Sequence, residues 1–128
     1  MPHPVMFDDA DPVLARVRTI ALGLPEATEK IAHGRPTFRC GKMFAVYGGS
    51  RRGQTATVLP TALLLIPDPA ERAALEQDTR FFVPAYLGAY GWLALELSAD
   101  CDWAEVAELL DASFRQVAPA RAITRLPE

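Results

Sequence analysis

The sequence contains few of the residues that form metal centres and disulfide bonds. Among its 128 residues are two cysteines and two histidines, and no two of them stand at the Cys-x₂₋₄-Cys or His-x₃₋₅-His spacings of zinc sites. A chain of which half the residues are apolar has no need of a disulfide to stabilise its core. We therefore expect no metal site, and free thiols at Cys40 and Cys101.

Long apolar runs are also missing. Pro60 interrupts the longest run, residues 56–67, which falls short of the ~20 residues that span a bilayer. The acidic segment 1–12 lacks the basic and apolar regions of a signal peptide. We expect a cytoplasmic protein without a membrane segment, and the length suits a single domain over residues 1–128.

Three stretches combine helical periodicity with a helix start. Asp11 and Asp68 each precede a proline, so the carboxylate can accept from free backbone N–H groups while the proline loses no hydrogen bond. We predict helices over residues 12–23 and 69–77. A third helix opens at Asp102, with Glu105 three residues later as in a capping box, and ends before Pro119. Its expected buried stripe consists of Val106, Leu109, Leu110, Phe114 and Val117.

Five further stretches read as strands. Residues 37–40 and 43–47 flank Gly41-Lys42, the residue order that a type II′ hairpin prefers because its first position needs a positive φ. Residues 61–66 are continuously apolar, which predicts a strand in the middle of the sheet. Residues 80–84 and 92–97 complete the set. Residues 26–33 fit either a helical turn or an extended approach to the sheet.

This order predicts a two-layer α+β fold of type α-β(3)-α-β(2)-α, with helices over one face of a mostly antiparallel sheet. The alternation of side chains in strands separates Trp92 from the leucines at positions 93, 95 and 97. If Phe38 and Cys40 face the helices, Arg39 lies on the other face together with an exposed Trp92. In the alternative, Trp92 is covered by loop 48–54 or by the C-terminal tail.

Charge is unevenly distributed along the chain. The net charge is −3, yet residues 30–66 contain six cations and no acid: Lys30, Arg35, Arg39, Lys42, Arg51 and Arg52. Such a segment can hold phosphate groups, because guanidinium groups match phosphate oxygens in geometry and charge. The alternative is that these side chains pair with the acidic segments 68–78 and 100–111, or are solvated.

No catalytic motif accompanies the basic segment. The sequence has no nucleophile elbow, no phosphate-cradling P-loop, no His-Glu-x-x-His and no dinucleotide fingerprint. His33 can act as a general base near neutral pH, but no nucleophile stands in a recognisable neighbourhood. We therefore assign no catalytic residue and no cofactor, and an enzyme that uses His33 on a small ligand is the least favoured interpretation.

Four stretches of the sequence resemble the MmcQ/YjbR family: residues 24–45, 68–75, 84–95 and 102–121. The resemblance implies an α-β(3)-α-β(2)-α fold similar to that of secretion chaperones, and its double-wing shape has led members to be labelled as DNA-binding. The resulting expectation is a non-enzymatic module that binds DNA through residues 30–66. The alternative is a protein-interaction or chaperone-like module that uses the open sheet face, also as a homodimer. The candidate binding residues are His33, Arg35, Arg39, Lys42, Arg51, Arg52 and Trp92.

Overall fold

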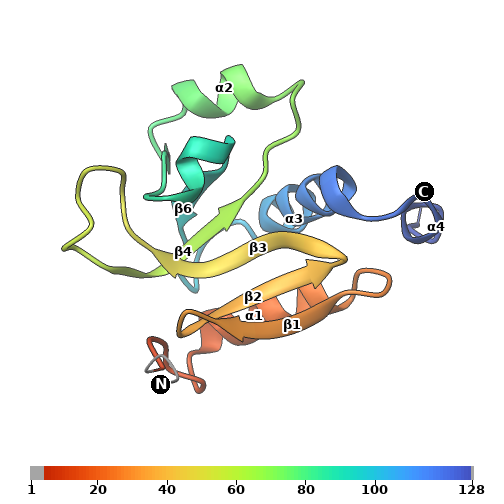
Figure 1. Cartoon of the computed structure of the whole chain (residues 1–128), viewed down its shortest axis with the longest axis horizontal. Helices are drawn as coiled ribbons and strands as arrows, with labels where there is room; N and C mark the ends of the chain where they lie inside the picture. Colours follow the sequence, from red (N-terminus) through yellow and green to blue (C-terminus); the bar gives the residue numbers. More distant parts are fainter. Residues whose placement is uncertain (1–4, 128) are drawn as a thin grey trace.

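The computed structural model describes residues 5–127 as one antiparallel sheet with helices against it (Figure 1). The six strands lie in the order β1-β2-β3-β4-β6-β5. They are β1 (Thr28–Ala32), β2 (Arg35–Cys40), β3 (Lys42–Gly49), β4 (Leu59–Leu65), β5 (Phe81–Phe82) and β6 (Leu93–Glu96). The helices are α1 (Pro12–Leu22), α2 (Arg72–Gln77), the 3₁₀ helix η1 (Leu87–Tyr90), α3 (Trp103–Val117) and α4 (Ala120–Ile123). The α+β class predicted from the sequence is confirmed.

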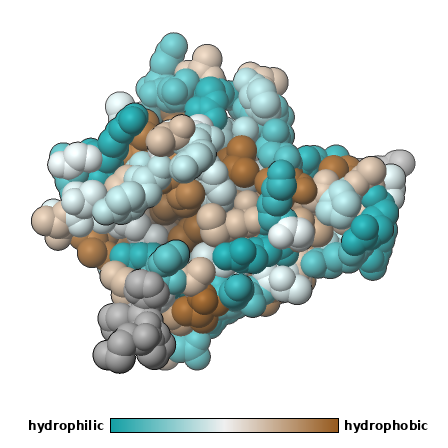
Figure 2. Space-filling view, viewed as in Figure 1, coloured by the Kyte–Doolittle hydropathy of each residue, from teal (hydrophilic) through white to brown (hydrophobic). Residues whose placement is uncertain are grey.

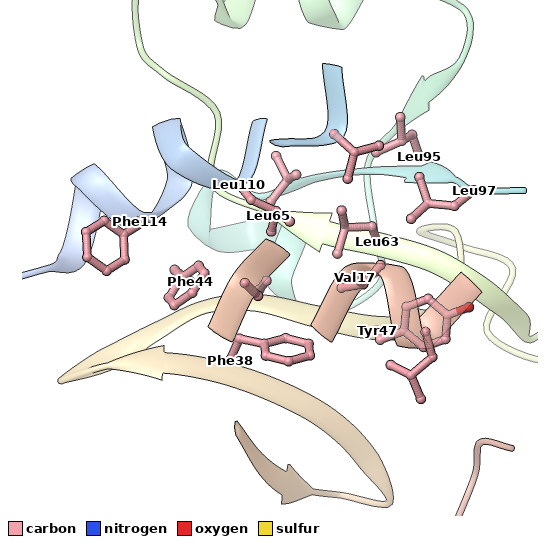
Figure 3. Close-up of a cluster of buried hydrophobic side chains, with 14 of the residues drawn as sticks. Val17, Phe38, Phe44, Tyr47, Leu63, Leu65, Leu95, Leu97, Leu110 and Phe114 are labelled. Atoms are coloured by element: carbon pink, nitrogen blue, oxygen red, sulfur yellow. The ribbon is translucent and has the colours of Figure 1, made fainter. Parts of the chain in front are cut away.

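Helices α1 and α3 pack on the same face of the sheet, which is turned away from the viewer in Figure 1. Their apolar stripes meet one side of the strands and form the main core, part of which Figure 3 shows. Phe44 of β3 and Phe114 of α3 pack edge to face, with 5.5 Å between ring centres. The fold therefore has two layers, and we call the sheet side that α1 and α3 leave uncovered the open face.

The open face carries a smaller apolar cluster that includes Trp92. Its buried members are Val46, Ala62, Leu64, Phe82, Trp92 and Ala94. Trp92 is only 6% exposed, so the expectation of an exposed tryptophan beside Arg39 is wrong. The predicted alternation itself is confirmed, because Leu93, Leu95 and Leu97 all lie in the main core. Trp92 is buried because the β5–β6 connection folds back as η1, whose Leu87 packs against the cluster.

Two of the three predicted helix N-caps are present in the structure. The Asp11 carboxylate accepts from the backbone N–H of Val13 at 2.8 Å, and that of Asp102 accepts from two N–H groups of α3, so both predicted caps are confirmed. Asp68 does not cap α2, which begins only at Arg72. Its carboxylate instead accepts from the N–H of Ala70 within the preceding turn.

Two features of the sheet differ from the sequence prediction or refine it. Residues 28–32, left open between helix and extended chain, form the edge strand β1, so four strands stand between α1 and α2. The hairpin between β2 and β3 is confirmed, and Gly41 has the expected positive φ of 77°. The predicted two-residue connection is wrong, because Lys42 already pairs with Cys40 as the first residue of β3. β4 lies between β3 and β6, with Ala62–Leu65 buried, as its continuous apolar run predicts.

A buried serine joins α3 to two strands. The Ser113 hydroxyl donates to the Phe44 carbonyl at 2.5 Å and accepts from the Ile66 N–H at 2.8 Å. Ser113 has no exposed surface, so these two bonds satisfy polar groups that water does not reach. Among the described residues, no helix is both long enough and apolar enough to cross a membrane.

Candidate nucleic-acid interface

Three cations are aligned on the open face at the β1–β2 end of the sheet. The strand register places Lys30 opposite Thr37, Ala32 opposite Arg35, and Thr28 opposite Arg39. Directly paired residues of antiparallel strands share a face, and the neighbouring Phe38 and Cys40 point into the main core. Lys30, Arg35 and Arg39 therefore lie on the open face, and we call them the basic strip. Figure 2 views this face and shows hydrophilic residues around hydrophobic ones near its middle.

Thr37 fixes the geometry around Arg39. Its hydroxyl donates to the carbonyl of Lys30 at 2.6 Å and accepts from Nε of Arg39 at 3.1 Å. Thr37 is buried, so this hydroxyl is held in place rather than exchanging with solvent. The bond from Nε orients the guanidinium of Arg39 and leaves its two terminal amino groups available to an anion.

Arg35 lies against the backbone of β3. Gly48 has a φ of 93°, and a side chain there would collide with Nη1 of Arg35, so the glycine makes room for the guanidinium. Nη1 is buried and has no hydrogen-bond partner within the described chain. Burial also lowers the pKa of Arg35, because a charged group loses the hydration that stabilises it. A cation without a counter-charge is thus built into the strip.

Two further arginines lie in the loop of residues 50–58. The guanidinium of Arg51 stacks over the Phe82 ring at 4.3 Å, and its Nη2 lies 3.9 Å from Glu96. The loop is held against the chain after β5, because Arg51 pairs with Pro84 and the Arg52 N–H donates to the Val83 carbonyl at 2.9 Å. Arg52 itself is exposed.

Several acidic residues of the described chain are paired with arginines outside the basic segment. Arg80 binds both Asp78 and Glu105, and these bonds raise its pKa. Further pairs join Arg18 to Asp9 and Glu29, Arg115 to Asp111, and both Arg121 and Arg125 to Glu26. Within residues 5–127, no carboxylate oxygen lies within 4.0 Å of the cationic nitrogens of Lys30, Arg35, Arg39, Lys42 or Arg52. The expected pairing of the basic segment with segments 68–78 and 100–111 is therefore wrong, and the other half of that alternative, that these side chains are solvated, stays a prediction.

The remaining candidates are spread over the edges of this surface. His33 is exposed in the β1–β2 turn with a φ of 54°. Lys42 is exposed at the start of β3, after the hairpin turn. Arg35 and Arg39 are brought together with Lys30, whereas Trp92 lies inside the apolar cluster and contributes no exposed ring.

Sequence reasoning missed two exposed aromatic residues, Tyr86 and Tyr90. They are 83% and 81% exposed and stand at the two ends of η1. The available signal was their position in the glycine-containing connection 84–91, which shows neither helical nor strand periodicity. Aromatic residues in a segment without a readable hydrophobic period are candidates for exposure.

His33 lines neither of the two main grooves on the described part of the chain. These grooves, of about 360 and 520 Å³, lie between α2 and α3 and beside the end of α1. Within residues 5–127, no group of three or more His, Cys, Asp or Glu side chains is placed to hold a metal ion. Both cysteines are free thiols, and burial raises the pKa of Cys40.

The fold and this surface define a small α+β module whose sheet presents unneutralised cations on one face. The YjbR family model matches residues 22–116, so the chain belongs to the YjbR family. Its fold is similar to the crystal structure of Deinococcus radiodurans protein DR2400, which has a DUF419 domain. That match has a TM-score of 0.66 and 19% sequence identity, and covers 89% of this chain and 88% of the other. No curated protein gives a significant match.

Proposed function

We propose that this YjbR protein is a binding module, rather than an enzyme, and that it binds DNA through the basic strip and the arginines of loop 50–58. The strip supplies Lys30, Arg35 and Arg39 on the open face, and the loop supplies Arg51 and Arg52. Phosphate contacts of this kind provide most of the affinity in protein–DNA binding that is independent of sequence.

The observation that carries the proposal is that five of the six cations in residues 30–66 have no carboxylate partner among the described residues. The chain has more acidic than basic residues, so there are enough carboxylates to pair with every one of these cations. The acids instead gather elsewhere: Asp68, Glu71, Glu105 and Glu108 line the groove between α2 and α3. This separation gives an acidic protein one surface that attracts a polyanion.

The test is the salt dependence of binding to a short DNA duplex, followed by fluorescence anisotropy. If about four cations contact phosphates, the logarithm of the association constant falls with the logarithm of salt concentration with a slope of roughly −3 to −4. Replacing Arg39 by alanine should reduce the steepness by about 0.9.

The matched control is Arg115→Ala. Arg115 is an exposed arginine on α3 that pairs with Asp111, so its removal changes the net charge equally without touching the open face. An equal loss of affinity in both variants would show that only net charge matters. No binding at low salt would refute DNA binding itself.

The alternative is a protein-interaction or chaperone-like module that uses the open sheet face, with a second copy of the chain as one partner. The observation in favour of a second copy is the edge strand β1, which pairs with β2 alone among the described strands. Its exposed Ile31 pairs with Pro36 and so lies on the helix side of the edge rather than on the open face. Such edges accept an additional strand. Light scattering of the protein and of Ile31→Lys tests this: a monomeric mass for both contradicts a homodimer through this edge.

A further inference from the structure

Tyr86 and Tyr90 are two exposed tyrosines at the ends of η1, in the connection whose backbone contacts the arginine loop. Most of the surrounding segment is packed inward: Ala85 and Trp92 are buried, and Leu87 packs against the cluster on the open face. The two tyrosines belong to neither apolar cluster, and each keeps more than four-fifths of its surface exposed. Aromatic side chains that a well-packed segment holds in solvent are available to stack on a ligand.

The backbone at Tyr86 is strained. Its φ of 65° and ψ of −67°, with the Leu87 N–H donating to the Ala85 carbonyl at 2.8 Å, form the γ-turn with positive φ, which is rare. Glycine adopts such a conformation with less strain than a residue with a Cβ. Burial of the ring does not offset the strain within the described chain, because the ring is exposed. Strain of this kind tends to occur at binding sites.

Positive charge lies beside the tyrosines. The Ala85 N–H, one residue before Tyr86, donates to the Ser50 carbonyl at 2.8 Å, and Arg51 pairs with Pro84. Figure 1 shows the loop between β3 and β4 on the same side of the molecule as β6. Segments 50–59 and 83–92 together contain two arginines and no acid. The tyrosines are thus joined to a cationic loop.

We propose that Tyr86 and Tyr90 are stacking platforms for unpaired bases, so that the preferred ligand of this surface is single-stranded nucleic acid, with Arg51 and Arg52 at its phosphates. This inference rests on the proposed DNA binding and specifies the form of the ligand. Bases inside a duplex stack on each other and hide their faces, whereas unpaired bases stack on aromatic side chains regardless of sequence. Two exposed rings joined to a loop that carries Arg51 and Arg52 match that chemistry. Of these two arginines, Arg52 has no carboxylate partner among the described residues, and Arg51 lies 3.9 Å from Glu96.

The experiment compares a 15-nucleotide oligo(dT) with a duplex of equal length, by anisotropy at several salt concentrations. The oligo(dT) should bind more tightly than the duplex. Tyr90→Ala should weaken oligo(dT) binding about fivefold or more, and Tyr90→Phe should restore it, because phenylalanine keeps the stacking ring. Tyr86→Gly, which relieves the strained turn, should show a similar loss without loss of the fold. Leu22→Ala, at an exposed apolar position on α1, is the control.

The possible outcomes separate the two proposals. Duplex binding with normal salt dependence, together with oligo(dT) binding that neither Tyr90→Ala nor Tyr86→Gly weakens, overturns the stacking inference and leaves DNA binding intact. Absence of binding to either ligand at low salt overturns both. A loss in Tyr90→Phe equal to that in Tyr90→Ala also overturns the inference, because it assigns the effect to the hydroxyl group rather than to the ring.

Discussion

Replacing Arg35 by leucine should stabilise the fold and weaken DNA binding at the same time. Nη1 of Arg35 is buried without a partner in the described chain, and a buried unsatisfied polar group costs about 1–3 kcal/mol. Leucine removes that group and retains most of the apolar stem. We therefore expect the free energy of unfolding to rise by about 1–2 kcal/mol.

The same substitution removes one cation from the basic strip. If Arg35 contacts one phosphate, the salt slope becomes shallower by about 0.9, which corresponds to an affinity about eightfold lower at ~0.1 M salt. Stability is measured by urea denaturation and affinity by anisotropy on the same preparations. The free energy of unfolding should rise while the affinity for DNA falls.

Arg39→Leu is the matched control on the same strand. Nε of Arg39 is hydrogen-bonded to Thr37, so its removal should weaken DNA binding without the gain in stability. A lower free energy of unfolding in Arg35→Leu would refute the reasoning that the buried, unpaired Nη1 destabilises the fold. A gain in stability with unchanged affinity would remove Arg35 from the interface.

Three further predictions concern positions that support the site or the core. Ser113→Ala should destabilise the fold by about 2–4 kcal/mol in urea denaturation, because two buried backbone groups lose their partner, and a change below ~0.5 kcal/mol would contradict this. Gly48→Ala should cost about 1–2 kcal/mol through its positive φ and should also reduce DNA affinity by displacing Arg35. Cys40 should react with iodoacetamide at pH 8 more slowly than Cys101, since burial shields its thiol and raises its pKa; equal rates would indicate that the end of β2 opens.

Much of the fold follows from short-range patterns. The caps at Asp11 and Asp102, the positive φ at Gly41 and the alternation of Leu93, Leu95 and Leu97 were all readable in the sequence. Each depends on a residue and its neighbours within a few positions, and local geometry dictates the outcome. The start of α2 was misplaced because Asp68 had a competing bond to make within its own turn.

The candidate site was only partly predictable. The alternation placed Arg39 on the open face, and the charge distribution drew attention to residues 30–66. Neither could reveal that Arg35 fits against Gly48, because that contact joins strands whose register the sequence leaves undetermined. The tyrosines were missed because a 3₁₀ turn has no hydrophobic period to read.

By itself, the sequence determined the α+β class, the main helices and the hairpin, since these depend on capping, glycine and the periods of helix and strand. The tertiary structure decided which charges are neutralised. In it, glutamates form ion pairs with Arg18, Arg80 and Arg121 and not with the basic strip. It also buried Trp92 and exposed Tyr86. Burial and ion pairing are set by segments distant in sequence that pack together, and no local pattern specifies which of them will meet.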